Sequence, residues 1–460
     1  MANNISPHSS SYRDPSGFIF FKDGIYYRQI NKIYQEHFDH FISSGCYKNL
    51  VEKGLLLSHA DQTDNLTGDA DRYKTIKPEQ LSYISYPYEW GFDMLKDAAL
   101  LTLQLTKESI SFGLILKDAT PYNIQWHNGK LIFIDTLSFE KYNEAEPWIA
   151  YRQFCESFLA PLLLMHYSKN SLPQILLACP DGIPLAITSS LLPKRSRFSL
   201  HTYLHIHLHT SIVNKKNRQP EKKIVFSKQK MLNLISSLET LIIKLKLPPQ
   251  QTAWSEYYEE AMQRNDYVSQ KKEIIEQWVS QLNDVKTAID LGANEGEFSR
   301  ILSSKDIQTI ATDADPYCIN KLYNEIKTKN EKIQPLVVDL ANPSPSIGVL
   351  NKERDSFLQR TKTDLALALA LVHHLAIGRN IPFEKIFELF ASVANHIIVE
   401  FVPKSDSKVQ LMLQNKKDIY TNYTEEIFEK EMSLFFIISQ KQKITGTDRI
   451  LYLGKRLQSP

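Results

Sequence analysis

The residues that most constrain the fold are 365–372, LALALALV, which include no charged or polar side chain. Such a run fits a central strand whose two faces are both covered, as in a parallel sheet. The surrounding sequence alternates between strand and helix patterns. Strand patterns occupy 285–291, 309–313, 335–340, 364–372 and 396–401, and helical patterns occupy 297–303, 317–326 and 383–393. The C-terminal third is therefore predicted to be an α/β domain, with helices on both faces of a mostly parallel sheet.

A loop with two glycines follows the first of these strands. Its sequence is DLGANEG, from Asp290 to Gly296. Gly292 permits a tight turn, and Gly296 permits a ligand to approach the backbone closely. Asn294 stands where the GxGxxG loop that grips a pyrophosphate has its middle glycine. The pattern therefore favours a nucleoside ligand that carries no diphosphate.

Further aspartates follow the next two strands. Asp313 lies 21 residues after Gly292 (313 minus 292), close to the spacing of a carboxylate that holds ribose hydroxyls. Asp339 and Leu340 end the third strand pattern, where a carboxylate could accept a hydrogen bond from an adenine amino group. Each aspartate alone also fits a solvated strand end. Together with Asp290 and the glycine loop, they predict one crevice at the carboxyl edge of the sheet.

These motifs together resemble those of class I S-adenosylmethionine-dependent methyltransferases. The series is DLGANEG, TDADP, VVDL and LALALVHHL, and the resemblance covers about residues 278–453. It implies a Rossmann-like seven-stranded methyltransferase sheet whose last strand comes from DRILYLGKRL. It also implies S-adenosyl-L-methionine as the cofactor. The implied cofactor-binding residues are Asp290, Gly292, Asn294 and Gly296 around the methionine part, Asp313 at the ribose, and Asp339 with Leu340 at the adenine.

Two adjacent histidines, His373 and His374, lie in LVHHL at the position that faces the methyl acceptor in this family. A histidine near neutral pH can take a proton from an acceptor hydroxyl or amine, so both are candidate catalytic residues. The same dipeptide also fits an ordinary turn between a strand and a helix. The predicted reaction transfers a methyl group to an O or N nucleophile of a small molecule, a saccharide or a protein.

The N-terminal half contains LKDATPYN followed by FIDTLSFE, which resembles the catalytic half of kinase-like folds. Asn123 lies five residues after Asp118, and Asp135 lies 17 residues after it (135 minus 118). By this resemblance Asp118 is the base, and Asn123 and Asp135 hold Mg²⁺ against phosphate oxygens. The resemblance predicts an α+β kinase-like domain in front of the sheet.

This half also departs from the kinase pattern. Leu116 replaces the histidine that usually precedes the base, and Thr136-Leu137 replaces the usual Phe-Gly. There is no glycine-rich loop near residues 17–30, and Arg28 is the nearest candidate cation. We therefore expect a degenerate domain that recognises or positions the methyl acceptor. The alternatives are a Mg-ATP-dependent phosphotransferase, a non-catalytic cofactor-sensing scaffold, or a plain β-hairpin with a polar loop.

The polar stretch NKKNRQPEKK at 214–223 marks the main internal boundary. The predicted domains are 1–213, kinase-like; 214–275, a basic linker with a helical lead-in; and 276–460, the methyltransferase domain. The whole chain also resembles bacterial methyltransferases related to a nodulation protein. That impression rests on LKDATPYN, FIDTLSFE, WIAYRQFCESFLAPL and EFVPKSDSKVQ.

The composition argues against several other classes. Lysine and arginine number 54 against 52 aspartate and glutamate, which makes nucleic acid an unexpected partner. The four cysteines form no CxxC pair, which predicts neither a disulfide scaffold nor a cysteine-rich zinc site. The histidines between His201 and His209 would share one face of a strand, but no acidic or cysteine ligand lies nearby, so no metal is expected. No apolar run reaches the ~20 residues of a membrane span, and the first residues are polar. We expect a cytoplasmic protein.

Overall fold

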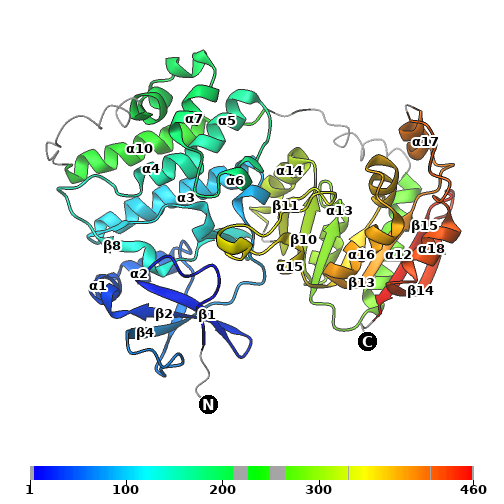
Figure 1. The fold of residues 1–460 in the computed structure, drawn as a ribbon, viewed down its shortest axis with the longest axis horizontal. Helices are drawn as coiled ribbons and strands as arrows, with labels where there is room; N and C mark the ends of the chain where they lie inside the picture. Colours follow the sequence, from blue (N-terminus) through cyan, green and yellow to red (C-terminus); the bar gives the residue numbers. More distant parts are fainter. Residues whose placement is uncertain are drawn as a thin grey trace. The chain divides into compact units, whose positions relative to one another are not determined.

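The computed structural model describes residues 5–210, 226–248, 250, 265–329, 331–414 and 416–457. The chain forms two compact units (Figure 1). Unit 1 contains Met1–Pro248 and Ser346–Asp355, and unit 2 contains Pro249–Pro345 and Ser356–Pro460. Among the described residues, none of the helices has the length and apolarity needed to cross a membrane.

Unit 2 is built on the predicted seven-stranded sheet. Its strands are β9 (Thr287–Leu291), β10 (Gln308–Asp313), β11 (Ile333–Val337), β12 (Thr363–Ala368), β13 (Ala394–Phe401), β14 (Phe436–Lys443) and β15 (Ile450–Arg456). Their order is β11-β10-β9-β12-β13-β15-β14. The first five strands of this order are parallel, and β15 runs antiparallel between β13 and β14. The prediction that the last strand comes from DRILYLGKRL is confirmed.

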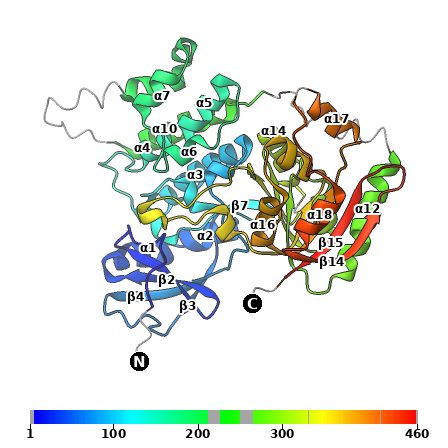
Figure 2. The ribbon, with the colours of Figure 1, turned by 45° about the vertical axis from the view of Figure 1, so that its right-hand side comes forward.

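Helices cover both faces of this sheet, as alternation along the strands requires. The helices of unit 2 are α12 (Asn265–Gln281), α13 (Glu297–Ser304), α14 (Pro316–Ile326), α15 (Phe357–Arg360), α16 (Phe383–Val393), α17 (Ser407–Leu413) and α18 (Glu425–Met432). Leu365 and Leu367 of β12 pack in one core with Trp278 of α12 and Phe298 of α13. On the other face, the Phe401 ring lies 5.0 Å from that of Phe428 in α18. Figure 2 shows α12 beside β14 and β15, where its last residue Gln281 accepts a hydrogen bond from Gln440.

Two strands end earlier than the sequence pattern predicts. β11 ends at Val337, and Asp339 begins a turn in which its carbonyl accepts a hydrogen bond from the Asn342 amide at 2.9 Å. β12 ends at Ala368, because Ala370 has a left-handed φ of 49° that interrupts the extended backbone. The apolar pattern continues past both strands because the turns that follow them are also largely buried.

Unit 1 begins with a four-stranded antiparallel sheet of order β1-β2-β4-β3 (Figure 1). These strands are β1 (Gly17–Lys22), β2 (Ile25–Asn31), β3 (His59–Gln62) and β4 (Arg72–Pro78), with helices α1 (Gln35–Ser43) and α2 (Cys46–Glu52) between β2 and β3. Asp23-Gly24 is a strong hairpin signal between two alternating segments, and it forms the two-residue turn between β1 and β2. Both residues have positive φ, as a two-residue hairpin turn of this type needs.

The rest of unit 1 is mainly helical, around the long helix α3 (Phe92–Ser111). Two short β-ladders carry the kinase-like motif: β5 (Leu114–Leu116) with β8 (Phe139–Lys141), and β6 (Ile124–His127) with β7 (Lys130–Phe133). The remaining helices are α4 (Tyr151–Phe154), α5 (Ala160–Ser168), α6 (Ile175–Ala178), α7 (Leu185–Leu191), α8 (Leu200–Thr202) and α10 (Lys228–Lys244), with π-helical turns at Cys155–Leu159 and Tyr203–Leu208.

The histidine-rich stretch is helical, so its interpretation as a strand was wrong. His205 contacts Tyr151 at 2.8 Å, whereas His207 contacts Ser189 at 2.8 Å and Ser196 at 2.9 Å. His201 and His205 share the Ser237 hydroxyl, whereas the His207 imidazole points to other hydroxyl partners. Within the described ranges, no three histidine, cysteine, aspartate or glutamate side chains gather where they could hold a metal.

The boundaries of the two compact units differ from the boundaries of the predicted domains. Helix α10, expected in the connecting segment, packs in unit 1, where Lys96 donates hydrogen bonds to the carbonyls of Ile243 and Leu245. Helix α12 belongs wholly to unit 2, because its apolar residues enter the core of the sheet. The basic stretch 215–223 and the aromatic residues 254–258 lie outside the described residues.

Candidate functional site

The strand order of unit 2 reverses between β9 and β12. The chain places β10 and β11 on one side of β9, and β12 and β13 on its other side. In open α/β sheets, ligands bind outside the carboxyl ends of the strands at such a reversal. The glycine loop leaves β9 at this edge. A Cβ atom at Gly292, where φ is 76°, would lie 3.3 Å from Cδ1 of Leu371, which follows β12. The loops after β9 and β12 therefore pack against each other at the carboxyl edge of the sheet.

The second glycine of the loop serves helix packing. Gly296 precedes α13 and has a φ of 79°, which a side chain would strain. A Cβ atom at this position would lie 2.7 Å from Cδ1 of Leu322 in α14. The missing side chain thus lets α14 approach the loop. The sequence interpretation of this glycine, close approach by a ligand, assigned it a different physical reason.

Asp313 ends β10 with both carboxylate oxygens directed toward the glycine loop and the next turn. Oδ2 accepts a hydrogen bond from the Asn294 amide, and Oδ1 accepts one from the Asp315 amide, both at 2.8 Å. Asn294 has a φ of 51°, which turns its amide toward Asp313. Burial raises the pKa of Asp313 to about 6, against the opposing effect of these hydrogen bonds. At neutral pH the group is mainly an ionised acceptor held in one orientation.

Asp290 is the penultimate residue of β9 and is 2% exposed. Its Oδ2 accepts a hydrogen bond from the Ser299 hydroxyl at 2.7 Å. Burial raises the pKa of Asp290 to about 6, while Ser299 and the nearby Lys271 ammonium act in the opposite direction. Asp290, which is buried, and Asp313, which is partly exposed, therefore both have a pKa raised to about 6.

Asp339 lies further out than the other two aspartates. Its Oδ1 accepts a hydrogen bond from the Ala341 amide at 3.0 Å, and its Oδ2 accepts one from Arg379 at 3.2 Å. Leu340 beside it is buried. The structure thus pairs this carboxylate with a guanidinium, a partner that the sequence pattern did not suggest.

His373 and His374 lie in the helical segment that follows the Ala370 turn. Residues His374–Gly378 form a π-helical turn, and the ring centroids of His373 and His374 are 4.0 Å apart. Burial lowers the pKa of His373 well below its usual value, and lowers that of His374 to about 4. Both rings are therefore neutral at pH 7. In the described part of the chain, Nδ1 of His373 is a buried atom with no hydrogen-bond partner.

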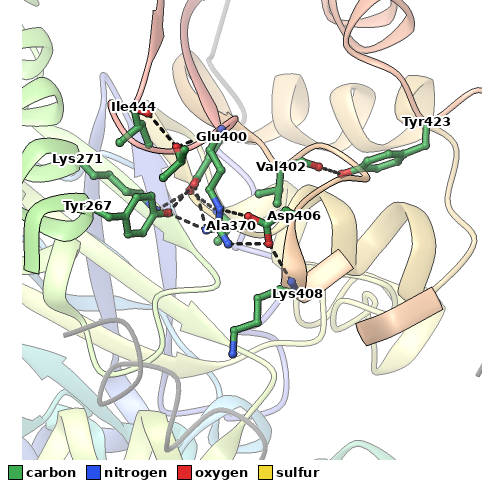
Figure 3. A network of polar contacts seen from close by, with 11 residues as sticks. Tyr267, Lys271, Ala370, Glu400, Val402, Asp406, Lys408, Tyr423 and Ile444 are labelled. Atoms are coloured by element: carbon green, nitrogen blue, oxygen red, sulfur yellow. Dashed lines mark hydrogen bonds and ion pairs between the residues drawn. The ribbon is translucent and has the colours of Figure 1, made fainter. Parts of the chain in front are cut away.

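A buried carboxylate that sequence analysis missed lies next to this turn (Figure 3). Glu400 of β13 is 0% exposed, forms an ion pair with Lys271 of α12, and accepts a hydrogen bond from the Tyr267 hydroxyl at 2.6 Å. The cations Lys271 and Arg449 hold the pKa of Glu400 near 2, although burial opposes them. The sequence did contain a signal for this residue. Glu400 is the single carboxylate in the largely apolar strand ANHIIVEF, and a buried charge needs partners.

The same network reaches the segments after β13 and before β15. Nε and Nη2 of Arg449 donate hydrogen bonds to the two Asp406 oxygens at 2.8 and 3.1 Å. Asp406 caps α17 by accepting a hydrogen bond from the Lys408 amide at 2.9 Å. Lys271, Glu400, Arg449 and Asp406 therefore form a charge-balanced cluster beside β13, in which the first three residues are buried.

Unit 1 brings together the residues of the kinase-like motif. The Asn123 side-chain amide donates hydrogen bonds to Asp118 at 3.1 Å and to Ser138 at 3.2 Å. Gln153 also donates to Asp118. Burial, with a further contribution from the nearby Asp135 charge, raises the pKa of Asp118. The spacing of the motif therefore does predict which residues meet.

The candidate metal ligand of unit 1 already pairs with a cation. Asp135 forms an ion pair with Arg28 of β2, and both side chains are largely buried. Asp135 also accepts hydrogen bonds from the Ser138 hydroxyl and from the Leu137 amide. A divalent ion at Asp135 would require this guanidinium to move.

Comparison with known proteins identifies the family. No family model matches the chain. The nodulation protein NoeA of Rhizobium meliloti (strain 1021) is 32% identical over 459 residues, and the alignment covers 97% of this chain and 96% of NoeA. The chain belongs to the NoeA family. Its two units therefore both fall within the part that is shared with NoeA.

Solved structures resemble this member of the NoeA family only in part. WbdD in complex with the kinase inhibitor LY294002 is 16% identical over 42% of this chain and 40% of WbdD, with a TM-score of 0.29. Magnesium protoporphyrin IX methyltransferase ChlM from Synechocystis PCC 6803, with bound SAM, is 14% identical over 46% of this chain and 87% of ChlM, with a TM-score of 0.30. The 16S rRNA methylase ArmA is 14% identical over 45% of this chain and 100% of ArmA, with a TM-score of 0.31. TM-scores of this size do not establish a shared fold.

Proposed function

We propose that unit 2 is an S-adenosyl-L-methionine-dependent methyltransferase that transfers a methyl group to an O or N nucleophile. One observation supports this proposal most strongly. The glycine loop after β9 and the carboxylates of Asp290 and Asp313 lie together at the edge of the sheet where the strand order reverses. Open sheets of this type bind nucleosides at that edge. The loop lacks the middle glycine of a pyrophosphate-binding turn, which supports a nucleoside ligand without a diphosphate.

The residues at this edge suit the parts of that cofactor. Asp313 is an oriented acceptor for ribose hydroxyls, since its oxygens retain lone pairs beyond the two backbone hydrogen bonds. Asp290, Gly292, Asn294 and Gly296 would border the methionine part. Asp339 and Leu340 would meet the adenine, with Arg379 holding the Asp339 carboxylate in place.

Methyl transfer depends more on alignment of the reactants and exclusion of water than on strong acid–base catalysis. The cofactor supplies an electrophilic methyl group on a sulfonium, whose positive charge disappears on transfer. Surroundings that exclude water and align the acceptor therefore favour the reaction. His373 and His374 are neutral at pH 7 because of their burial. Either imidazole would orient the acceptor by accepting a hydrogen bond, and would take up its proton only late.

The decisive experiment is isothermal titration of the purified protein with S-adenosylhomocysteine. Micromolar binding that is lost in Asp313→Ala, and kept in Asp448→Ala, supports the proposal. Asp448 is a matched control, because it forms an exposed ion pair with Lys443 in the same unit. Absence of binding to the wild-type protein would reject the methyltransferase site.

For unit 1 we propose a degenerate kinase-like domain that recognises or positions the methyl acceptor. The Arg28–Asp135 ion pair supports this role. Phosphoryl transfer would need the Asp135 carboxylate to bind a metal ion, but the Arg28 guanidinium already pairs with it. The alternative, a phosphotransferase that uses Asp118, Asn123 and Asp135, predicts magnesium-dependent ATP binding in the same calorimeter. A cofactor-sensing scaffold predicts tight S-adenosylhomocysteine binding without turnover on any acceptor.

The acceptor and the compartment belong to the same proposal. A small molecule, a saccharide or a protein suits the nearly balanced charge of the chain better than a nucleic acid does. Cys46, Cys155 and Cys318 are buried free thiols, as expected in the reducing cytoplasm.

A further inference from the structure

The turn after β12 has a backbone conformation that needs support. Ala370 adopts a left-handed φ of 49°, which disfavours a residue that has a Cβ atom. Its amide donates a hydrogen bond to Oε2 of Glu400 at 2.8 Å. The side chain of the next residue, Leu371, lies against Gly292 of the glycine loop. The Glu400 carboxylate therefore holds the turn that presents Leu371 to the glycine loop.

Glu400 is itself held in one orientation. Oε2 accepts from Lys271 and from the Ala370 amide, and Oε1 accepts from Tyr267 at 2.6 Å and from Arg449 at 3.4 Å. Its side chain is completely buried, so water cannot replace these donors. A carboxylate bound in this way cannot rotate without breaking several charge-assisted hydrogen bonds.

The same carboxylate also determines where Lys271 lies. The Lys271 ammonium packs 4.8 Å from the centroid of the Phe298 ring in α13 and lies close enough to Asp290 to act on its ionisation. Glu400 thus fixes a cation near Asp290 of β9. Two parts of the carboxyl edge of the sheet, the Ala370–Leu371 turn and the surroundings of Asp290, depend on this one side chain.

We infer that Glu400 is the positioning residue of the cofactor site. It would not touch the cofactor, and it would act by holding the Ala370 turn and Lys271 in the arrangement that receives the methionine part. This inference rests on the proposed methyltransferase function. It adds a residue on the fifth strand of the sheet to Asp290, Asp313 and Asp339, which lie at or just beyond the carboxyl ends of the first three strands.

The test compares S-adenosylhomocysteine affinity and thermal unfolding in wild type, Glu400→Gln and Glu400→Ala. Glu400→Gln keeps an oxygen for the Ala370 amide and loses the charge, whereas Glu400→Ala removes both. A hydrogen bond to a charged group contributes enough that we expect Glu400→Ala to bind at least about tenfold more weakly. Glu388→Gln is the matched control, because Glu388 forms an exposed ion pair with Lys385 within α16. It should bind as the wild type does.

A rescue variant separates positioning from general damage to the fold. Glycine adopts a positive φ without strain, so Ala370→Gly in the Glu400→Ala background should recover part of the lost affinity. A purely structural role for Glu400 would lower the unfolding temperature and leave that affinity unchanged by Ala370→Gly. Folded Glu400→Gln and Glu400→Ala proteins that both bind like the wild type would overturn the inference.

Hydrogen–deuterium exchange on the wild-type protein tests the same contact without any substitution. The Ala370 amide should be protected in the protein alone, and exchange at the rate of an exposed loop amide would overturn the inference even if the variants failed to fold. Failure of the wild type to bind S-adenosylhomocysteine would instead reject the methyltransferase proposal. Normal wild-type binding with unaffected variants would reject only the role of Glu400.

Discussion

The backbone amide of Asn294 donates a hydrogen bond to Oδ2 of Asp313 at 2.8 Å. This contact joins the glycine loop after β9 to the end of the neighbouring strand β10. The contact orients one oxygen of the Asp313 carboxylate. The ionisation of this carboxylate changes near neutral pH, because burial raises the pKa of Asp313 to about 6. The protonation state of this carboxylate should therefore control ligand binding.

Affinity for S-adenosylhomocysteine should fall as the pH falls through 6. The pKa of Asp313 in the protein alone is about 6, and ribose hydroxyls donate to the ionised form, so binding is strongest above that value. At pH 5 only about a tenth of such a group is ionised, which predicts about tenfold weaker binding. Titration calorimetry between pH 5 and 8 checks this. Asp313→Asn should bind weakly and show a flatter pH profile, and an equally steep profile in that variant would contradict the assignment.

Lys271→Met should strongly destabilise unit 2, because it leaves the buried Glu400 with less compensating charge. Removing one partner of a buried ion pair typically costs about 3–5 kcal/mol. The adjacent Lys272 is the control, since it pairs with Glu297 at a partly exposed position. Lys272→Met should cost under about 1 kcal/mol. Urea unfolding monitored by tryptophan fluorescence compares the two, and equal losses would argue against the buried network.

Gly296→Ala should destabilise the protein more than Gly446→Ala does. The two glycines have φ values of 79° and 77°, so the backbone strain is similar. A Cβ atom at position 296 would also meet Leu322 at 2.7 Å, whereas nothing lies within 4 Å at position 446. Overpacking of this kind costs about 1–3 kcal/mol beyond the strain. Thermal unfolding of the two variants measures the difference, and similar melting temperatures would refute the packing role of this glycine.

Asp118→Ala should leave S-adenosylhomocysteine affinity within about twofold of wild type, a change of under 1 kcal/mol. Its hydrogen-bond partners, Asn123 and Gln153, belong to unit 1, whereas the proposed cofactor residues belong to unit 2. Calorimetry with Asp313→Ala as the comparison checks this. A loss as large as that caused by Asp313→Ala would contradict the assignment of the cofactor site to residues of unit 2 alone.

Local sequence signals predicted the elements that depend on neighbouring residues. The turn at Asp23-Gly24 was predictable because a two-residue hairpin needs positive φ values. The strand ends at Leu291 and Asp313 were predictable because apolar runs stop there and turn residues follow. The end of β12 was not, because the buried turn at Ala370 is as apolar as the strand before it. The histidine stretch misled for a related reason, since alternation of histidine with apolar residues fits a strand as well as a buried helical turn.

The sequence by itself determined the order of strands and helices, the glycine loop and the aspartates at one edge of the sheet, since each depends on residues close together in the chain. Only the tertiary structure decided the partners of the buried charges. Lys271 and Glu400 lie 129 residues apart, and Arg28 and Asp135 lie 107 apart. A buried charge requires an opposite charge nearby, but that requirement does not say which distant residue supplies it. Packing of the strands and helices brings the pairs together, and so determines that Glu400 of unit 2 pairs with Lys271 and that Asp135 of unit 1 pairs with Arg28.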